Sequence, residues 1–181
     1  MKMHSENNEF KTISEMPDLT LEMKLLRQNL FSDDISKTKN RLWVFKDKLS
    51  DHDTFNDFGY LVSIKISDYD AILKEYDSNV ANKLLKLVSN YIMEYMKENH
   101  LNFEIVRYSE DNFLIFIHEL NEKEVEEHIV NIQKSMSNYR FKHRHKVFNL
   151  TFYFAVMQYI KNESFSSVLD QLDENLFLNK L

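Results

Sequence analysis

The sequence predicts an α/β (α+β) fold, in which helices lie on the faces of a mixed central sheet. Three patterns predict it. Residues 60–67 alternate apolar and polar side chains, as a strand does, and residues 78–98 repeat apolar side chains at helical spacing. Residues 103–118 contain two apolar runs separated by a short polar turn, as in a β-hairpin. A strand, a long helix and a hairpin in this order indicate a sheet interleaved with helices.

The first fifty residues are predicted to be mostly helical. Residues 1–17 are polar and aperiodic, so we expect a flexible N-terminal tail, and Pro17-Asp18 marks a helix start. Four apolar residues then recur at helical spacing, namely Leu19, Met23, Leu26 and Leu30. A second helix is expected over about residues 36–49, with Leu42, Phe45 and Leu49 on one face, before a polar loop over 50–57. We therefore expect a helical segment over 18–50 and the main domain over 51–181.

The second half of the chain continues the alternation. A helix is expected over about residues 122–136, and a strand over 147–160 that is apolar on both faces, as a central strand would be. Apolar residues from Phe165 to Leu176 then predict a closing helix. The predicted order after the helical lead is βααββαβα.

Composition excludes several classes of function. The 181 residues contain no cysteine, no apolar run of membrane-spanning length and no apolar signal-peptide core, so we expect a cytoplasmic protein without a membrane partner. A net charge of -6 argues against a nucleic-acid partner, because such proteins neutralise phosphates with surplus Lys and Arg. Gly59 is the single glycine of the chain. Glycine-rich phosphate-binding loops are therefore excluded.

The hairpin turn carries a family resemblance. Residues 107–113 read Arg-Tyr-Ser-Glu-Asp-Asn-Phe, which resembles the Arg-Tyr-Gly-Gly-Asp-Glu-Phe signature of GGDEF domains, the diguanylate cyclase family. Both glycines and the glutamate of the signature are replaced here. The resemblance extends over about the last 150 residues and implies the nucleotidyl-cyclase palm-like fold of that family.

Three further blocks carry the resemblance. Residues 33–41 are similar to the opening motif Asp-x-Leu-Thr-Gly-Leu-x-Asn-Arg, with Lys37 in place of its glycine. Residues 64–85 resemble Leu-Asp-Ile-Asp-His-Phe-Lys-x-Ile-Asn-Asp-x-Tyr-Gly-His-x-x-Gly-Asp-x-Leu-Leu and keep its apolar skeleton. Residues 172–180 are similar to the closing block Ala-Asp-x-Ala-Leu-Tyr-x-Ala-Lys, with Phe177 in place of tyrosine.

The resemblance implies that the nucleotide-binding positions of the family are replaced in this chain. The family aspartate that holds the magnesium ion bridging the GTP phosphates is matched by Lys65. A cation at this position repels Mg²⁺ and removes an oxygen ligand. The guanine-reading asparagine is matched by Leu73, which has no hydrogen-bonding group, and the guanine-reading aspartate by Asn82, which loses the charge.

The signature motif has also lost residues that bind nucleotide in the family. Ser109 and Glu110 replace the two glycines and put side chains where phosphate lies in the family. Asp111 keeps the carboxylate that binds metal or abstracts a proton, and Asn112 replaces the glutamate. An Asp-Asn pair is also typical of a hairpin turn, which is the simpler interpretation. Lys180 matches a phosphate-contacting lysine, but one residue from the C-terminus it is expected to be solvated. The inhibitory Arg-x-x-Asp of the family is matched by His-Leu-Asn-Phe at 100–103, so feedback binding of cyclic di-GMP is not expected.

We interpret the chain as a catalytically inactive, degenerate GGDEF domain that acts as a regulatory protein-binding module in cyclic di-GMP-related bacterial signalling, without cofactor or metal. Its partner is expected to be another protein or a second copy bound through the Leu19–Leu30 helix, although this helix could equally fold back on its own domain. Two alternatives stay open. One is a non-catalytic sensor of GTP or cyclic di-GMP, against which Leu73 and the missing glycines weigh. The other is a divergent nucleotidyl transferase that uses Asp111.

Residues 140–146, Arg-Phe-Lys-His-Arg-His-Lys, form the most basic segment of the chain. The segment could bind an anion, and His143 and His145 alternate as metal ligands do. Because no acidic residue or cysteine lies nearby in sequence, a basic solvated loop is the expected structure.

Overall fold

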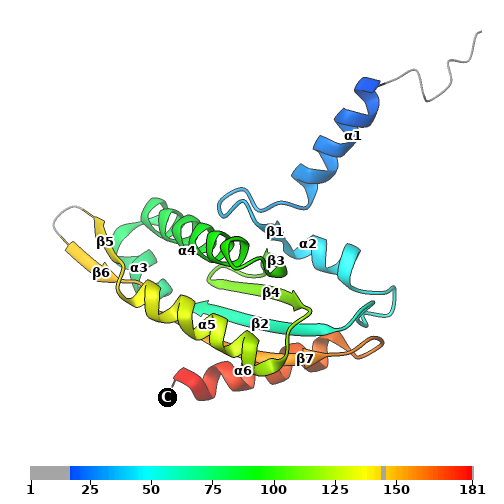
Figure 1. The fold of residues 1–181 in the computed structure, drawn as a ribbon. Coiled ribbons are helices and arrows are strands. Elements are labelled where there is room, and N and C mark those ends of the chain that lie inside the picture. Colours follow the sequence, from blue (N-terminus) through cyan, green and yellow to red (C-terminus); the bar gives the residue numbers. More distant parts are fainter. Residues whose placement is uncertain (1–16, 144–145, 181) are drawn as a thin grey trace, which may run out of the picture. The chain divides into compact units, whose positions relative to one another are not determined.

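The computed structural model describes residues 17–143 and 146–180 and divides the chain at Leu30 into two units (Figure 1). Helix α1 (Pro17–Leu30) belongs to the first unit and begins at the predicted residue. The expected N-terminal tail lies outside the described residues apart from Pro17. No helix in the described part of the chain is both long enough and apolar enough to cross a membrane.

The second unit, Phe31–Leu181, is built on a mixed five-stranded sheet. The strands, in spatial order, are β1 (Lys39–Asn40), β3 (Asn102–Arg107), β4 (Asn112–His118), β2 (Gly59–Ile66) and β7 (Phe152–Tyr159). β1 pairs with β3 in parallel, and the other neighbours are antiparallel. The predicted hairpin over 103–118 is therefore confirmed as β3 and β4, and its turn is closed by the Tyr108 amide, which donates to the Asn112 carbonyl at 3.0 Å.

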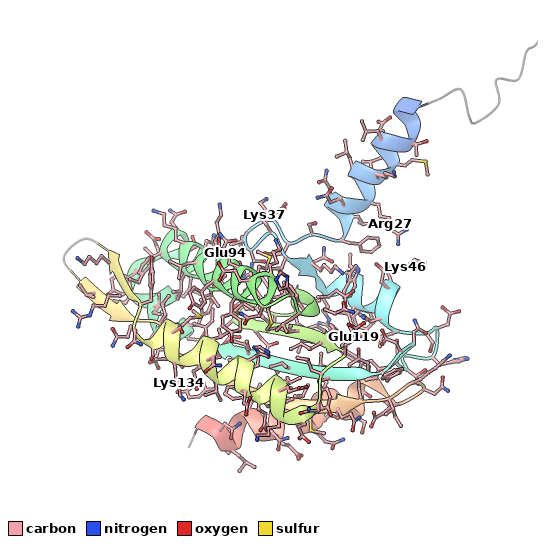
Figure 2. The ribbon with its side chains drawn as sticks, viewed as in Figure 1. Arg27, Lys37, Lys46, Glu94, Glu119 and Lys134 are labelled. Atoms are coloured by element: carbon pink, nitrogen blue, oxygen red, sulfur yellow. The ribbon has the colours of Figure 1, made fainter. Side chains whose placement is uncertain are left out.

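Helices cover both faces of this sheet. One face carries α3 (Tyr69–Tyr76), α4 (Ser78–Glu98) and α5 (Glu122–Ser137), and the other carries α2 (Arg41–Trp43), the π-helical turn η2 (Val44–Lys48) and α6 (Phe165–Lys180). Figure 2 shows that charged side chains such as Glu94 on α4 and Lys134 on α5 lie on the outside. Apolar side chains of these helices pack against the sheet. The predicted helix-covered mixed sheet is confirmed.

The alternation along β2 explains the two hydrophobic cores. Val62, Ile64 and Ile66 pack under α4 and α5, whereas Leu61 packs on the opposite face with α6. Successive side chains of a strand point to opposite faces, so one strand serves both cores. β2 is fixed between β4 and β7 in a register that sets Lys65 opposite both Asn112 and Tyr153.

The predicted helix over 36–49 is wrong in its first part and in its buried face. Asp33 accepts hydrogen bonds from the Ser36 amide and hydroxyl, both at 2.7 Å, and Lys37 adopts a left-handed φ of 59°, so the chain turns before β1. Helical structure begins only at Arg41. Of the three residues predicted on one face, Leu42 and Phe45 are exposed and Leu49 is buried, and the neighbouring Trp43 and Val44 are buried as well.

The predicted strand over 147–160 is interrupted, and it is not central. Its residues divide between β6 (Lys146–Asn149) and β7, which is an edge strand of the main sheet. β7 is apolar on both faces because α5 and α6 pack against opposite sides of it. β6 pairs with β5 (Arg140–His143), so the predicted basic loop is a two-stranded hairpin, in which Arg140 and Lys142 are exposed as expected. His145 lies outside the described residues.

In several turns a residue other than glycine adopts a positive φ. Seven described residues other than glycine have positive φ: Lys37, Asp53, Asp68, Asp77, His100, Glu119 and Asn162. Gly59, by contrast, is required by space, because a Cβ atom there would lie 2.7 Å from the Ile117 carbonyl oxygen. The chain therefore uses its glycine for a close backbone approach and accepts left-handed side-chain-bearing residues elsewhere.

A buried lysine, Lys48, links η2 to the sheet. It contacts β3 and β4 at their ends opposite the hairpin turn. The Lys48 ammonium lies 2.9 Å from Glu104 Oε2, 3.1 Å from Asp57 Oδ2 and 3.1 Å from His118 Nε2. The Lys48 side chain is only 7% exposed. Because the ammonium can only donate, His118 accepts at Nε2, and its Nδ1–H donates to the Phe58 carbonyl at 3.1 Å. The Lys48 ammonium thus has two hydrogen-bond partners, Asp57 and His118, and an ion pair with Glu104.

Candidate functional site

A cavity of about 640 Å³ opens where β2 ends beside the hairpin turn. β2, the turn after it and α3 supply one wall, the hairpin turn and β7 the second, and α6 the third. The lining residues are Lys65, Ile66, Asp68, Tyr69, Asp70, Ala71, Lys74, Asp111, Tyr153, Asp173, Leu176 and Phe177. Two of the sequence-predicted positions, Lys65 and Asp111, are therefore brought together in this cavity.

Lys65 and Asp111, which both line the cavity, form an ion pair. The Lys65 Nζ atom lies 3.4 Å from Asp111 Oδ2, and the Asp111 side chain is 17% exposed. A magnesium ion needs oxygen ligands in near-octahedral geometry, and an ammonium beside the carboxylate competes for the same oxygen. In the described part of the chain no group of three His, Asp or Glu residues is arranged to hold a metal ion. The residues of this cavity do not fit Mg²⁺.

Asn112 faces the interior of the sheet. Its side chain is buried, and Nδ2 donates a hydrogen bond to the Ser63 hydroxyl at 2.7 Å. A buried amide needs such a partner, because an unsatisfied donor would cost about 1–3 kcal/mol. The Asn112 side chain therefore links β4 to β2 by a hydrogen bond inside the sheet.

The remaining sequence-predicted positions lie away from the cavity wall. Leu73 packs against the core under α4, and Asn82 is half-buried on α4. Ser109 and Glu110 are exposed in the hairpin turn. None of these four is among the described residues that line the cavity, and the side chain of Lys180 lies outside the described part.

The hairpin turn is anchored by Arg107. Its guanidinium lies 3.3 Å from each carboxylate oxygen of Asp33 and 3.1 Å from the Glu110 carbonyl oxygen. Burial raises the pKa of Asp33, but hydrogen bonds from Ser36 and the charge of Arg107 together hold it below its ordinary value. The opening-motif loop and the hairpin turn are thus joined by Arg107, whose Nη1 donates to both oxygens of Asp33 and whose Nη2 donates to the Glu110 carbonyl.

Two polar side chains in the cavity lack strong partners. Burial raises the pKa of the Tyr69 phenol, Arg107 opposes this, and the charges of Glu110 and Asp111 add to it. Burial also raises the pKa of the Asp173 carboxyl, with Lys65 opposing. Both shifts come chiefly from desolvation at the cavity wall.

Sequence reasoning missed most of the cavity wall. The sequence assigns no role to Asp68, Asp70, Lys74 or Tyr153, although Asp68 and Asp70 lie within three residues of the end of the predicted strand over 60–67. The usable signal was that position, because polar residues just beyond a strand end often line a site. Tyr153 is set opposite Lys65 only by the strand register, which the sequence does not reveal.

Comparison with known proteins identifies the fold and the family. The family model described as "Diguanylate cyclase, GGDEF domain" matches residues 31–181. No curated protein sequence matches significantly.

Solved structures with the same fold share little sequence. DgcB from Caulobacter crescentus, in a structure of its coiled coil and GGDEF domain with c-di-GMP, is 18% identical with a TM-score of 0.74, covering 92% of this chain and 89% of that chain. SiaD from Pseudomonas aeruginosa, a diguanylate cyclase in complex with its activator SiaC, is 11% identical with a TM-score of 0.72; the match covers 92% of this chain but only 65% of SiaD. The FimX GGDEF domain from Pseudomonas aeruginosa is 14% identical with a TM-score of 0.67, covering 82% and 93% of the two chains. The chain belongs to the GGDEF domain family of diguanylate cyclases.

Proposed function

We propose that this GGDEF domain is catalytically inactive and acts as a regulatory protein-binding module in cyclic di-GMP-related bacterial signalling. The observation that carries the proposal is the ion pair between Lys65 and Asp111, 3.4 Å apart. It places a cation at the position that matches the magnesium-binding aspartate of the family. It also occupies the carboxylate that the signature retains.

Two further features support loss of the cyclase reaction. Asn112 cannot act as a carboxylate, and its amide is already engaged with Ser63 inside the sheet. Leu73 packs into the core and offers no hydrogen bond to a guanine base. Phosphoryl transfer depends on metal ions and positioned donors that neutralise the developing charge, and a cavity without them offers little stabilisation of the transition state.

The proposed partner is another protein or a second copy of this chain. α1 supports this, because considered by itself it exposes Met23 at 64%, Leu26 at 61% and Leu30 at 58%. Exposed apolar side chains on one helix stripe are typical of a surface that pairs with another helix. The SiaD structure, which contains its activator SiaC, gives a precedent in the family for binding a protein.

A calorimetric titration of the purified chain with GTP and with cyclic di-GMP, each with Mg²⁺, tests whether the site still binds nucleotide. We expect no heat of binding from either. Micromolar binding of either nucleotide without a product would favour the alternative of a nucleotide sensor and would contradict a purely protein-binding role.

The partner is tested by measuring the solution mass of the full chain and of a Met23→Glu, Leu26→Glu variant. Lys24→Glu on the same helix is the matched control, because it adds negative charge without removing an apolar side chain. A dimeric mass lost in the double variant alone would identify the partner as a second copy. A monomeric wild-type chain would leave a different protein as the partner, to be captured with the wild-type chain and lost with the double variant.

A further inference from the structure

The cavity beside Lys65 has an excess of negative charge. Among the described residues, four aspartates line it, against two lysines. One of these lysines, Lys65, is already paired with Asp111, so within the described lining Lys74 alone remains to balance Asp68, Asp70 and Asp173. Charges lining a concave, partly desolvated wall interact more strongly than on an open surface. A phosphate group entering here would meet net repulsion, whereas a cation would be attracted.

The Tyr69 side chain adds an independent sign that the cavity receives a ligand. Tyr69 is only 5% exposed and lines the cavity. Its hydroxyl makes no hydrogen bond to any described residue and is not among the fully buried unpaired atoms, so it keeps access to the cavity. The charges that act on it belong to Arg107, Glu110, Asp111 and Asp70. A largely buried side chain whose unpaired hydroxyl reaches a cavity can bond a group that enters it.

The rest of the wall suits a flat cation. Tyr153 and Phe177 contribute aromatic rings, and Leu176 contributes an apolar floor. A guanidinium is planar, stacks on aromatic faces and donates several hydrogen bonds in a fixed fork. It can therefore contact rings and carboxylates together, which a compact ammonium does less well. A cavity of about 640 Å³ admits an arginine side chain together with part of the chain that carries it.

We propose that this cavity binds the guanidinium group of an arginine in a basic segment of the partner protein. Asp173 and Asp68 receive its charge, the Tyr69 hydroxyl accepts one of its N–H groups, and the ring of Tyr153 or Phe177 covers its face. The inference rests on the proposed protein-binding function and specifies the kind of partner. The resemblance implies a nucleotide and magnesium site at this position, and in this chain the same position would bind a guanidinium group instead.

The probe is N-acetylarginine amide, titrated into the full chain and followed by amide chemical shifts in NMR spectra. N-acetylcitrulline amide is the matched probe, because it has the same shape and no charge. We expect saturable, millimolar binding of the arginine compound with shifts at Tyr69, Asp111 and Asp173, and about tenfold weaker binding or none for citrulline.

Two variants test the assigned contacts. Asp173→Asn is at an exposed position and should leave the fold unchanged, and Tyr69→Phe removes only the hydroxyl. We expect Asp173→Asn to weaken arginine binding by about tenfold and Tyr69→Phe by a few-fold. Glu126→Gln, at an exposed position on α5, is the control and should bind as wild type does.

Equal binding of both compounds, no saturation with the arginine compound, or binding unaffected by Asp173→Asn would each overturn the proposal. Saturable binding of inorganic triphosphate would overturn it as well, because the charge of the ligand would be opposite. Measuring GTP turnover on the same samples distinguishes failure of the proposed inactive function from failure of the proposed arginine site. Turnover would refute the inactive function itself, whereas its absence together with an arginine-insensitive cavity would refute only the assignment of this site.

Discussion

Replacing Lys48 by methionine should destabilise the domain strongly. Methionine keeps the length of the side chain but removes the ammonium that Glu104, Asp57 and His118 share at 2.9–3.1 Å. It also removes the cation that lies 5.3 Å from the centre of the Phe116 ring. The Glu104 carboxylate then keeps one weaker counter-ion, Lys39, whose Nζ atom lies 3.6 Å from Glu104 Oε1.

The magnitude follows from burial. Removing one partner of a buried ion pair costs about 3–5 kcal/mol, because the remaining charge is left uncompensated. Glu104 is 28% exposed and Asp57 is 41% exposed, so water partly solvates both carboxylates. We therefore expect the low end, about 3 kcal/mol. In a chain of this size that corresponds to a fall in Tm of roughly 6–12 °C.

The effect should depend on pH. Burial raises the pKa of Glu104, but the hydrogen bond and charge of Lys48 hold it below its ordinary value. In the wild type this contribution is present above the unfolded pKa of Glu104 and is lost as pH falls through the lower folded pKa. Without Lys48 the pKa of this carboxyl should rise, so protonation relieves the penalty. The Tm difference between wild type and variant should therefore be larger near pH 7.5 than near pH 5.

Thermal unfolding by circular dichroism at these two pH values measures the effect. Lys46→Met is the matched control, because Lys46 is exposed in the same helical turn (Figure 2), and its Tm should stay within about 2 °C of wild type. A Lys48→Met variant as stable as the control, or a difference that grows as the pH falls, would refute the reasoning.

Three other substitutions have defined outcomes, each measured by denaturant unfolding. Gly59→Ala should destabilise by about 1–3 kcal/mol, because the new Cβ would meet the Ile117 carbonyl oxygen at 2.7 Å; a neutral effect would contradict that clash. Lys37→Gly should stabilise by roughly 0.5–1 kcal/mol, since relief of the left-handed φ of 59° exceeds the added unfolded-state entropy, and a loss of stability would show that the strain is absent. Asp33→Asn should destabilise near pH 7, and the difference should shrink toward pH 3, because the depressed pKa of Asp33 stabilises only above its folded value; a pH-independent difference would exclude the Arg107 pair as the cause.

Most elements of the fold could be predicted because their residues obey one periodicity. β2, α4, α5 and the hairpin each show a regular apolar repeat that burial against a single neighbour imposes. The segment before β1 could not be predicted from its periodicity. Hydrogen bonds to Asp33 and the left-handed backbone conformation of Lys37 form a turn where the apolar pattern favours a helix. β7 resembled a central strand because α5 and α6 cover both of its faces, and hydrophobicity does not distinguish coverage by helices from coverage by strands.

The candidate site was predictable only as a set of positions. The resemblance placed Lys65 and Asp111 at related points of the motif, but their ion pair depends on the register between β2 and β4. Asn112 was interpreted as a turn residue, and its inward bond to Ser63 is a consequence of the same register. Tyr69 matched an apolar position of its block, so its unpaired hydroxyl carried no signal in the sequence.

The pairing of Lys65 with Asp111 should leave the domain without cyclase activity. The most direct measurement is to incubate the purified chain with GTP and Mg²⁺, and separately with Mn²⁺, and to separate the products by chromatography. We expect unchanged GTP in both, identical to an Asp111→Ala variant. Formation of cyclic di-GMP or a linear dinucleotide by the wild type, lost in Asp111→Ala, would contradict the account and identify the domain as an active nucleotidyl transferase.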